Sequence, residues 1–133
     1  MLWILAPALL QPNAYLDAVE SIVWGQEWQW GYHKHPSLYS NVLYLLYLLF
    51  DNLVLATAVA SQLSVGLAFL AVWYVGKEIV GAQRALVAVL ALEGIYYYNW
   101  VSVQFNGDIL LLAGFAWMTL AFSQLLPALA GSS

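Results

Sequence analysis

Two carboxylates near the start of this chain have a spacing that could support chemistry. Asp17 and Glu20 are three residues apart in the sequence LDAVES, which places both carboxylates on one face of a helix. Such a pair can bind a divalent cation through oxygen ligands, or divide into a general base and a partner that tunes it. The spacing equally suits two solvated charges on a helix at a membrane surface, and the residues alone leave both interpretations open.

A run of titratable groups, His33-Lys34-His35-Pro36, lies in the same polar segment. A lysine can hold a phosphate as a point charge, and a histidine can ligate a metal or move protons near neutral pH. A His-x-His pair supplies at most two of the three or four ligands that zinc prefers, so a metal site is only a weak inference. The alternative is a lysine whose stem lies along the membrane boundary while its amine reaches water.

Aromatic residues separate these two groups. Trp24, Trp28, Trp30 and Tyr32 fall within nine positions. Tryptophan and tyrosine collect at membrane interfaces, because an apolar ring with a polar edge suits that boundary. Such rings also stack on sugars and line headgroup clefts, so their density beside charged residues keeps a binding site open as the second interpretation.

A second polar segment, NWVSVQFNGD, lies later in the chain. Asn106-Gly107 is a turn signal, and Asp108 stands where a helix would begin, so capping is its default role. Glu93 falls within an otherwise apolar stretch. A carboxylate at membrane depth is costly unless it is paired or hydrated, which makes Glu93 a candidate functional residue.

The composition indicates the class of protein that must position these residues. The chain has 133 residues, of which 64% are hydrophobic and 8% charged, whereas soluble domains carry about 25% charged residues. There is no cysteine, and seven carboxylates outnumber three lysines and arginines. A multi-pass membrane protein is therefore predicted, while disulfides, cysteine nucleophiles and a nucleic-acid surface are excluded.

The apolar segments predict a single all-α membrane domain over residues 1–133. About 20 residues are needed to cross a bilayer, so residues 1–10 are predicted to be the end of a truncated first span and the chain a fragment. A signal peptide is the competing interpretation of residues 1–10, weakened by the lack of a positively charged start and of a small-residue cleavage site. Residues 53–75, 85–98 and 109–126 are predicted spans, the last ended by Pro127. Residues 13–50 form the predicted outer loop, in which residues 37–50 are a helix lying at the membrane surface.

The basic residues predict the topology. Lys77 and Arg84 are two cations in one short segment, and the positive-inside rule assigns that segment to the cytoplasm. Alternation then places the outer loop and the segment around Asn106 and Asp108 together on the opposite, non-cytoplasmic face. A site drawn from two loops on one face becomes possible.

The order of four motifs along the chain resembles that of a known family. The order LDAVES, GQEWQWGYHKHPSL, VGKEIVGAQRA and EGIYYYNWVSVQFNGD resembles the N-terminal region of bacterial glycosyltransferase family 39. These enzymes have a GT-C-type membrane helical bundle and are related to protein O-mannosyltransferases and to the aminoarabinose transferase of lipid A. The resemblance covers essentially the whole chain. It implies a multi-pass protein of the bacterial plasma membrane with its site on the periplasmic or extracellular side.

The resemblance also implies roles for individual residues. The family's essential aspartate falls on Asp17, with Glu20 at the place of a nearby acidic residue, although the family's better-known members have the two acids adjacent. Its Lys-Pro or His-Pro-Pro signature falls on Lys34, His35 and Pro36. The residues implied to bind substrate are Tyr32, Lys34, His35, Asn106 and Asp108, with no decision between the last two.

The implied reaction is transfer of a sugar from a polyprenyl-phosphate donor to an unknown acceptor. Asp17 would act as general base or hold the acceptor, and Lys34 would offset charge on the leaving phosphate, with a divalent cation as a candidate cofactor. Two other classes of function stay open. One is a small noncatalytic membrane subunit or scaffold, and the other is a transporter fragment in which Glu93 couples transport.

Overall fold

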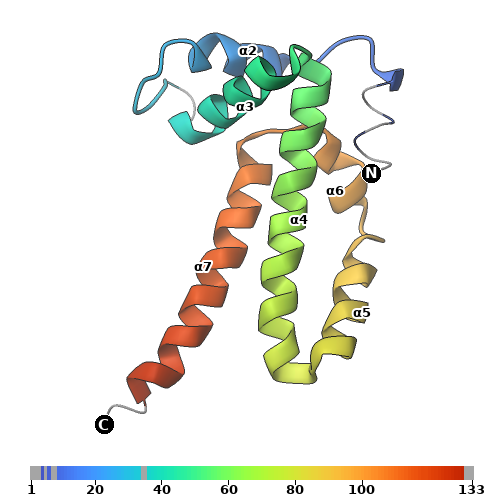
Figure 1. Cartoon of the computed structure of the whole chain (residues 1–133), viewed down its shortest axis with the longest axis vertical. Helices are drawn as coiled ribbons and strands as arrows, with labels where there is room; N and C mark the ends of the chain where they lie inside the picture. Colours follow the sequence, from blue (N-terminus) through green and yellow to red (C-terminus); the bar gives the residue numbers. More distant parts are fainter. Residues whose placement is uncertain (1–3, 5, 7–8, 34–35, 131–133) are drawn as a thin grey trace.

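The regular elements of this protein are helices, as the composition predicts. The computed structural model describes residues 4, 6, 9–33 and 36–130. Two helices lie across one end of a set of long upright helices (Figure 1). The predicted end of a first span at residues 1–10 falls largely outside the described residues.

The two helices at the end of the molecule are α2 (Leu16–Gly25) and α3 (Ser37–Phe50). They pack closely because α2 presents small residues, Ala18, Ser21 and Gly25, which are buried. A Cβ at Gly25 would lie only 2.6 Å from the Tyr44 Cβ of α3. The predicted helix at residues 37–50 is thereby confirmed, while its placement at a membrane surface stays a prediction.

A sharp corner joins α3 to the long helix α4 (Leu53–Val80). Asp51 ends α3 in the left-handed region with φ of 49°, which aspartate tolerates better than most residues. The Asn52 side chain then caps α4 by accepting a hydrogen bond of 3.0 Å from the Leu55 amide, so the chain breaks at Asp51-Asn52 before α4 begins. The helix α4 continues five residues beyond the predicted end of this span.

A single glycine connects α4 to α5 (Ala82–Leu92). Gly81 has φ of +86°, a backbone conformation that costs glycine little because it has no Cβ. The two helices pack closely beside this turn, since a Cβ at Gly76 of α4 would lie 3.1 Å from the Ala85 Cβ of α5. Lys77 and Arg84 therefore lie at adjoining helix ends and not in the short loop that the sequence suggested.

The predicted span at residues 85–98 is broken. The helix α5 ends at Leu92, and the short helices α6 (Tyr96–Asn99) and η1 (Val101–Val103) follow after a bend of 76°. The Asn99 amide donates a 2.8 Å hydrogen bond to the Glu93 backbone carbonyl and so stabilises the bend. Glu93 thus lies exposed at a break within the apolar stretch that was predicted to span the membrane.

The last helix, α7 (Gly107–Ala130), packs along α4. It continues past Pro127, where the sequence suggested an end. Within the described part of the chain, α4 and α7 are each long and apolar enough to cross a membrane, and a third crossing is possible if the bent pair counts as one span. The buried residues that join the upright helices to α2 and α3 include Leu43, Phe105 and Ile109.

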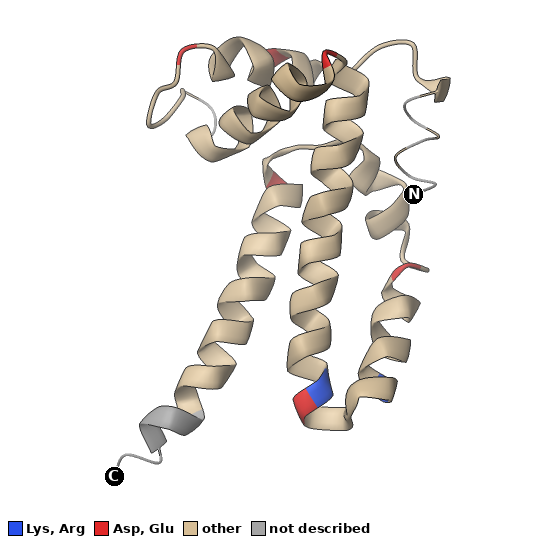
Figure 2. Ribbon diagram, in the orientation of Figure 1, with Lys and Arg blue, Asp and Glu red and all other residues tan. Residues whose placement is uncertain are grey.

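The charged residues separate along the molecule (Figure 2). Lys77 and Arg84, with Glu78, lie at the end where α4 turns into α5. Asp17, Glu20 and Asp51 belong to the opposite end, carried by α2 and the corner after α3. The described residues therefore form one end with both cations and another end that is acidic.

Candidate functional site

Asp17 and Glu20 lie in the first turns of α2, as their spacing predicts. The Asp17 side chain is exposed and that of Glu20 is half-buried. The residue before the helix is Tyr15, which makes no side-chain cap. A carboxylate in the first helical turn also interacts favourably with the helix dipole.

Tyr39 of α3 connects Asp17 with the loop before α7. Its hydroxyl lies 3.1 Å from the Asp17 backbone carbonyl and 3.4 Å from that of Phe105, so it can donate to either oxygen. Only 3% of the tyrosine is exposed. Burial raises the pKa of Tyr39, the neighbouring Ser21 side chain lowers it by less, and the negative charges of Asp17 and Glu20 raise it further.

The second polar segment lies at the start of α7, and its two candidate residues have different roles. The Asn106 side-chain oxygen accepts a 3.0 Å hydrogen bond from the Ile109 amide, which is the geometry of a helix cap. Asp108 is exposed in the first turn of the helix. The cap is thus Asn106, whereas the sequence suggested Asp108, and the carboxylate of Asp108 is left available to solvent.

The structure brings the main chains of these two segments together, because one tyrosine hydroxyl reaches a carbonyl of each. The exposed carboxylates of Asp17 and Asp108 therefore belong to segments that meet at Tyr39. The predicted pairing of the two polar segments at one end of the molecule agrees with this geometry.

Tyr32 has a different setting. Its ring stacks on Trp24 with centroids 5.7 Å apart, and its hydroxyl lies 3.4 Å from the Asn41 side-chain oxygen. Trp24 is seven residues beyond Asp17, about two turns or roughly 10 Å along the helix. Tyr32 is therefore anchored near the far end of α2 from the Asp17 carbonyl.

Two predicted site residues, Lys34 and His35, lie outside the described residues. Lys77 and Arg84 belong to the opposite end of the molecule, and the chain has three lysines and arginines. Lys34 is consequently the remaining basic residue of the chain. Among the described residues, no three histidines or carboxylates form a group that could hold a metal ion.

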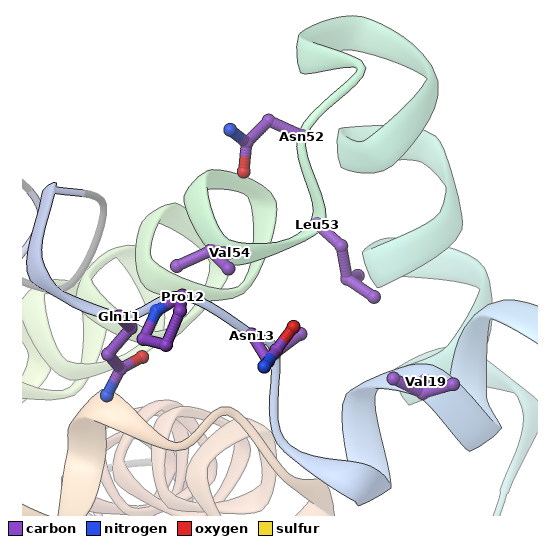
Figure 3. Close-up of a pocket in the computed structure, with 8 residues that line it drawn as sticks. Gln11, Pro12, Asn13, Val19, Asn52, Leu53 and Val54 are labelled. Carbon is purple, nitrogen blue, oxygen red and sulfur yellow. The ribbon is translucent and has the colours of Figure 1, made fainter.

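A pocket of about 360 Å³ lies beside the segment that enters α2 (Figure 3). None of the predicted site residues lines it, and its polar groups are uncharged amides. Its lining residues come from this entry segment, from α2 and from the start of α4: Gln11, Pro12, Asn13, Ala14, Val19, Asn52, Leu53 and Val54. Such a lining suits neutral polar groups better than a phosphate, which needs cations or backbone donors.

Sequence reasoning missed Tyr39 and Phe105. Their rings pack with centroids 5.1 Å apart, although 66 residues separate them along the chain. Tyr39, Tyr44 and Tyr47 occupy one apolar helix, and no local signal distinguishes the tyrosine that faces the second segment. The nearest signal in the sequence is Pro36, three residues before Tyr39, which marks the start of the helix but not the tyrosine's role.

The fold and the acidic end define a multi-pass helical membrane protein with two helices, α2 and α3, lying across one end of its spans. A family model for dolichyl-phosphate-mannose-protein mannosyltransferase matches residues 34–129. The chain belongs to this family of membrane glycosyltransferases, as the resemblance implied. The matched residues include Lys34, His35, Asn106 and Asp108, whereas Asp17, Glu20 and Tyr32 precede them. No curated protein and no solved structure gives a significant match.

Proposed function

We propose that this chain contributes the acceptor-activating face of a glycosyltransferase, which transfers a sugar from a polyprenyl-phosphate donor to an acceptor hydroxyl on the non-cytoplasmic side of the membrane. Family membership supports the reaction and the class of donor. The observation that carries the assignment to particular residues is the meeting of the Asp17 and Phe105 segments at the Tyr39 hydroxyl. It supports a site built from both polar segments.

In the proposed reaction, the Asp17 carboxylate accepts the proton of the acceptor hydroxyl as that oxygen attacks the anomeric carbon. The new glycosidic bond forms as the bond from the anomeric carbon to the phosphate oxygen breaks, and the polyprenyl phosphate leaves with that electron pair. The exposure of Asp17 favours this role, because an acceptor can approach the carboxylate directly. Glu20, on the same helix, adds negative charge near the base.

Charge on the leaving phosphate needs a counterion. We assign this role to Lys34, because the other two basic residues belong to the opposite end of the molecule. His35 and Tyr32 are proposed to border the donor, and Asp108 to form the wall across from Asp17. A divalent cation is a candidate for sharing the phosphate charge, although the described residues contain no group of three histidines or carboxylates to hold it.

The positive-inside rule supports the orientation of this site. Lys77 and Arg84 adjoin at the α4–α5 turn, opposite the acidic end (Figure 2). We therefore propose that the turn faces the cytoplasm of a bacterial cell and that α2 and α3 face the periplasm or the exterior.

The direct test replaces Asp17 by Asn in the protein as its gene encodes it. Sugar transfer from a polyprenyl-phosphate donor is measured in membrane vesicles, and we expect a fall of at least about a hundredfold, as for removal of a general base. Asp51→Asn is the matched control: the same chemical change at an exposed carboxylate, at a left-handed position that asparagine also tolerates. Equal activity of both variants would refute the role of Asp17.

Substitutions at Asp17 and Glu93 separate the alternative functions. A noncatalytic subunit or scaffold predicts that Asp17→Asn leaves the function of its complex intact. The transporter alternative predicts that Glu93→Gln abolishes ion-coupled uptake, yet Glu93 lies at the break between α5 and α6. No described contact favours either alternative over the transferase.

A further inference from the structure

The helix that carries Asp17 has little direct packing against the helix that carries Asp108. The helix α2 packs chiefly on α3, and α7 packs chiefly on α4. The position of one carboxylate relative to the other therefore depends on α3, the element that α2 rests on. Within α3, Tyr39 contacts the loop before α7 through both its hydroxyl and its ring.

Three features adapt Tyr39 to hold both segments. Its hydroxyl lies within hydrogen-bond distance of the Asp17 and Phe105 carbonyls, at 3.1 and 3.4 Å. Its ring packs against Phe105, which is 1% exposed. Because the side chain is almost completely buried, water cannot readily replace either contact.

We propose that Tyr39 is a positioning residue that fixes the Asp17 turn of α2 relative to the loop leading into α7. The inference rests on the proposed function for its catalytic consequence, but its structural part stands on the contacts alone. Tyr39 touches neither substrate in this proposal. It acts by limiting how far the Asp17 and Asp108 segments move apart, which keeps the base at reaction distance from the acceptor.

The structural part is tested with a distance measurement that needs no activity. The chain contains no cysteine, so Val23→Cys and Gln104→Cys accept two nitroxide labels specifically, and both positions are exposed. Pulsed dipolar spectroscopy then reports the distance distribution between α2 and the loop before α7. We expect Tyr39→Phe, which keeps the ring on Phe105, to broaden this distribution.

Tyr47→Phe is the matched control, because it removes a hydroxyl from the same helix for which no described hydrogen bond is found. It should leave the distribution unchanged. A second measurement uses the protein that keeps Tyr39. Raising the pH until the tyrosines ionise removes the proton that Tyr39 donates. The doubly labelled protein should then show the same broadening, and Tyr39→Phe should show no further change. An unaltered distribution in both experiments would overturn the proposal.

The catalytic part is read from kinetics in vesicles. Loss of positioning should lower kcat by about tenfold, while the donor KM changes by less than about twofold, because alignment and not donor binding is lost. If Asp17→Asn abolishes transfer but Tyr39→Phe does not slow it, the catalytic role of Tyr39 is wrong. If Asp17→Asn has no effect while the distance still broadens, the proposed function fails and the structural link stands.

Discussion

The rings of Tyr39 and Phe105 pack with centroids 5.1 Å apart and planes tilted by 43°. This contact joins α3 to the loop before α7. Tyr39 of the outer loop is therefore buried against the second polar segment. Burial of the tyrosine also has an energetic consequence that depends on pH.

The first prediction concerns alkaline stability. Burial, with the charges of Asp17 and Glu20, raises the pKa of Tyr39 in the folded protein above the usual value of 10.0. The unfolded chain therefore loses this proton at lower pH than the folded chain does. The stability contributed by the neutral hydroxyl is complete below about pH 10 and is lost as the pH rises from there through the folded pKa.

Thermal unfolding in detergent, followed by circular dichroism at a series of pH values, measures this effect. The Tm of the wild type should fall more steeply above about pH 10 than that of Tyr39→Phe. At neutral pH the variant should be less stable by about 0.5–1.5 kcal/mol, the usual net value of a hydrogen bond. Parallel curves for the two proteins would contradict the prediction.

The second prediction concerns the close approach of α2 and α3. A Cβ at Gly25 would lie 2.6 Å from the Tyr44 Cβ and 2.9 Å from the Ser40 carbonyl oxygen. Neither atom is the end of a flexible side chain, so the helices must separate. Gly25→Ala should cost about 1–3 kcal/mol by overpacking, measured as a lower Tm in detergent.

Gly114→Ala is the helical control for that variant. A Cβ there meets no atom within 4 Å, and alanine favours a helix over glycine by about 0.5–1 kcal/mol. This substitution should leave the Tm unchanged or raise it. Equal destabilisation by both variants would show that the α2–α3 contact is not the cause.

The third prediction separates the two candidate residues at the start of α7. Asn106→Ala removes the acceptor for the Ile109 amide and should cost about 0.5–2 kcal/mol. Asn106→Asp keeps that acceptor, so it should retain most of the stability. Asp108→Asn should not reduce stability by more than about 0.5 kcal/mol, since its side chain is exposed.

Sugar transfer by the same variants completes this comparison. If the exposed carboxylate forms a wall of the site, Asp108→Asn should reduce transfer more than Asn106→Asp does. The reverse order would assign the substrate contact to Asn106 instead. Either result resolves a choice that the amino-acid pattern left open.

Much of the fold could be predicted from local patterns. The helix at residues 37–50 and the cap at Asn52 follow from a short apolar run between Pro36 and the Asp51-Asn52 break. The break at Glu93 could not be predicted, because it depends on a hydrogen bond from Asn99 back to a carbonyl that would otherwise continue the helix. The sequence around Gly81 likewise suggests a loop, but the positive φ of this glycine lets α4 and α5 meet directly.

The sequence by itself determined that this is a multi-pass helical membrane protein of a glycosyltransferase family, because composition, apolar length and motif order are properties of the chain as written. Only the tertiary structure decided that Tyr39 joins the Asp17 turn to the Phe105 loop and that Asn106 caps α7. The contacts of Tyr39 join segments that are far apart in the sequence, and the contact of Asn106 decides which of two neighbouring residues caps the helix. They depend on how helices pack against one another, and packing selects among side chains that look equivalent in a linear pattern.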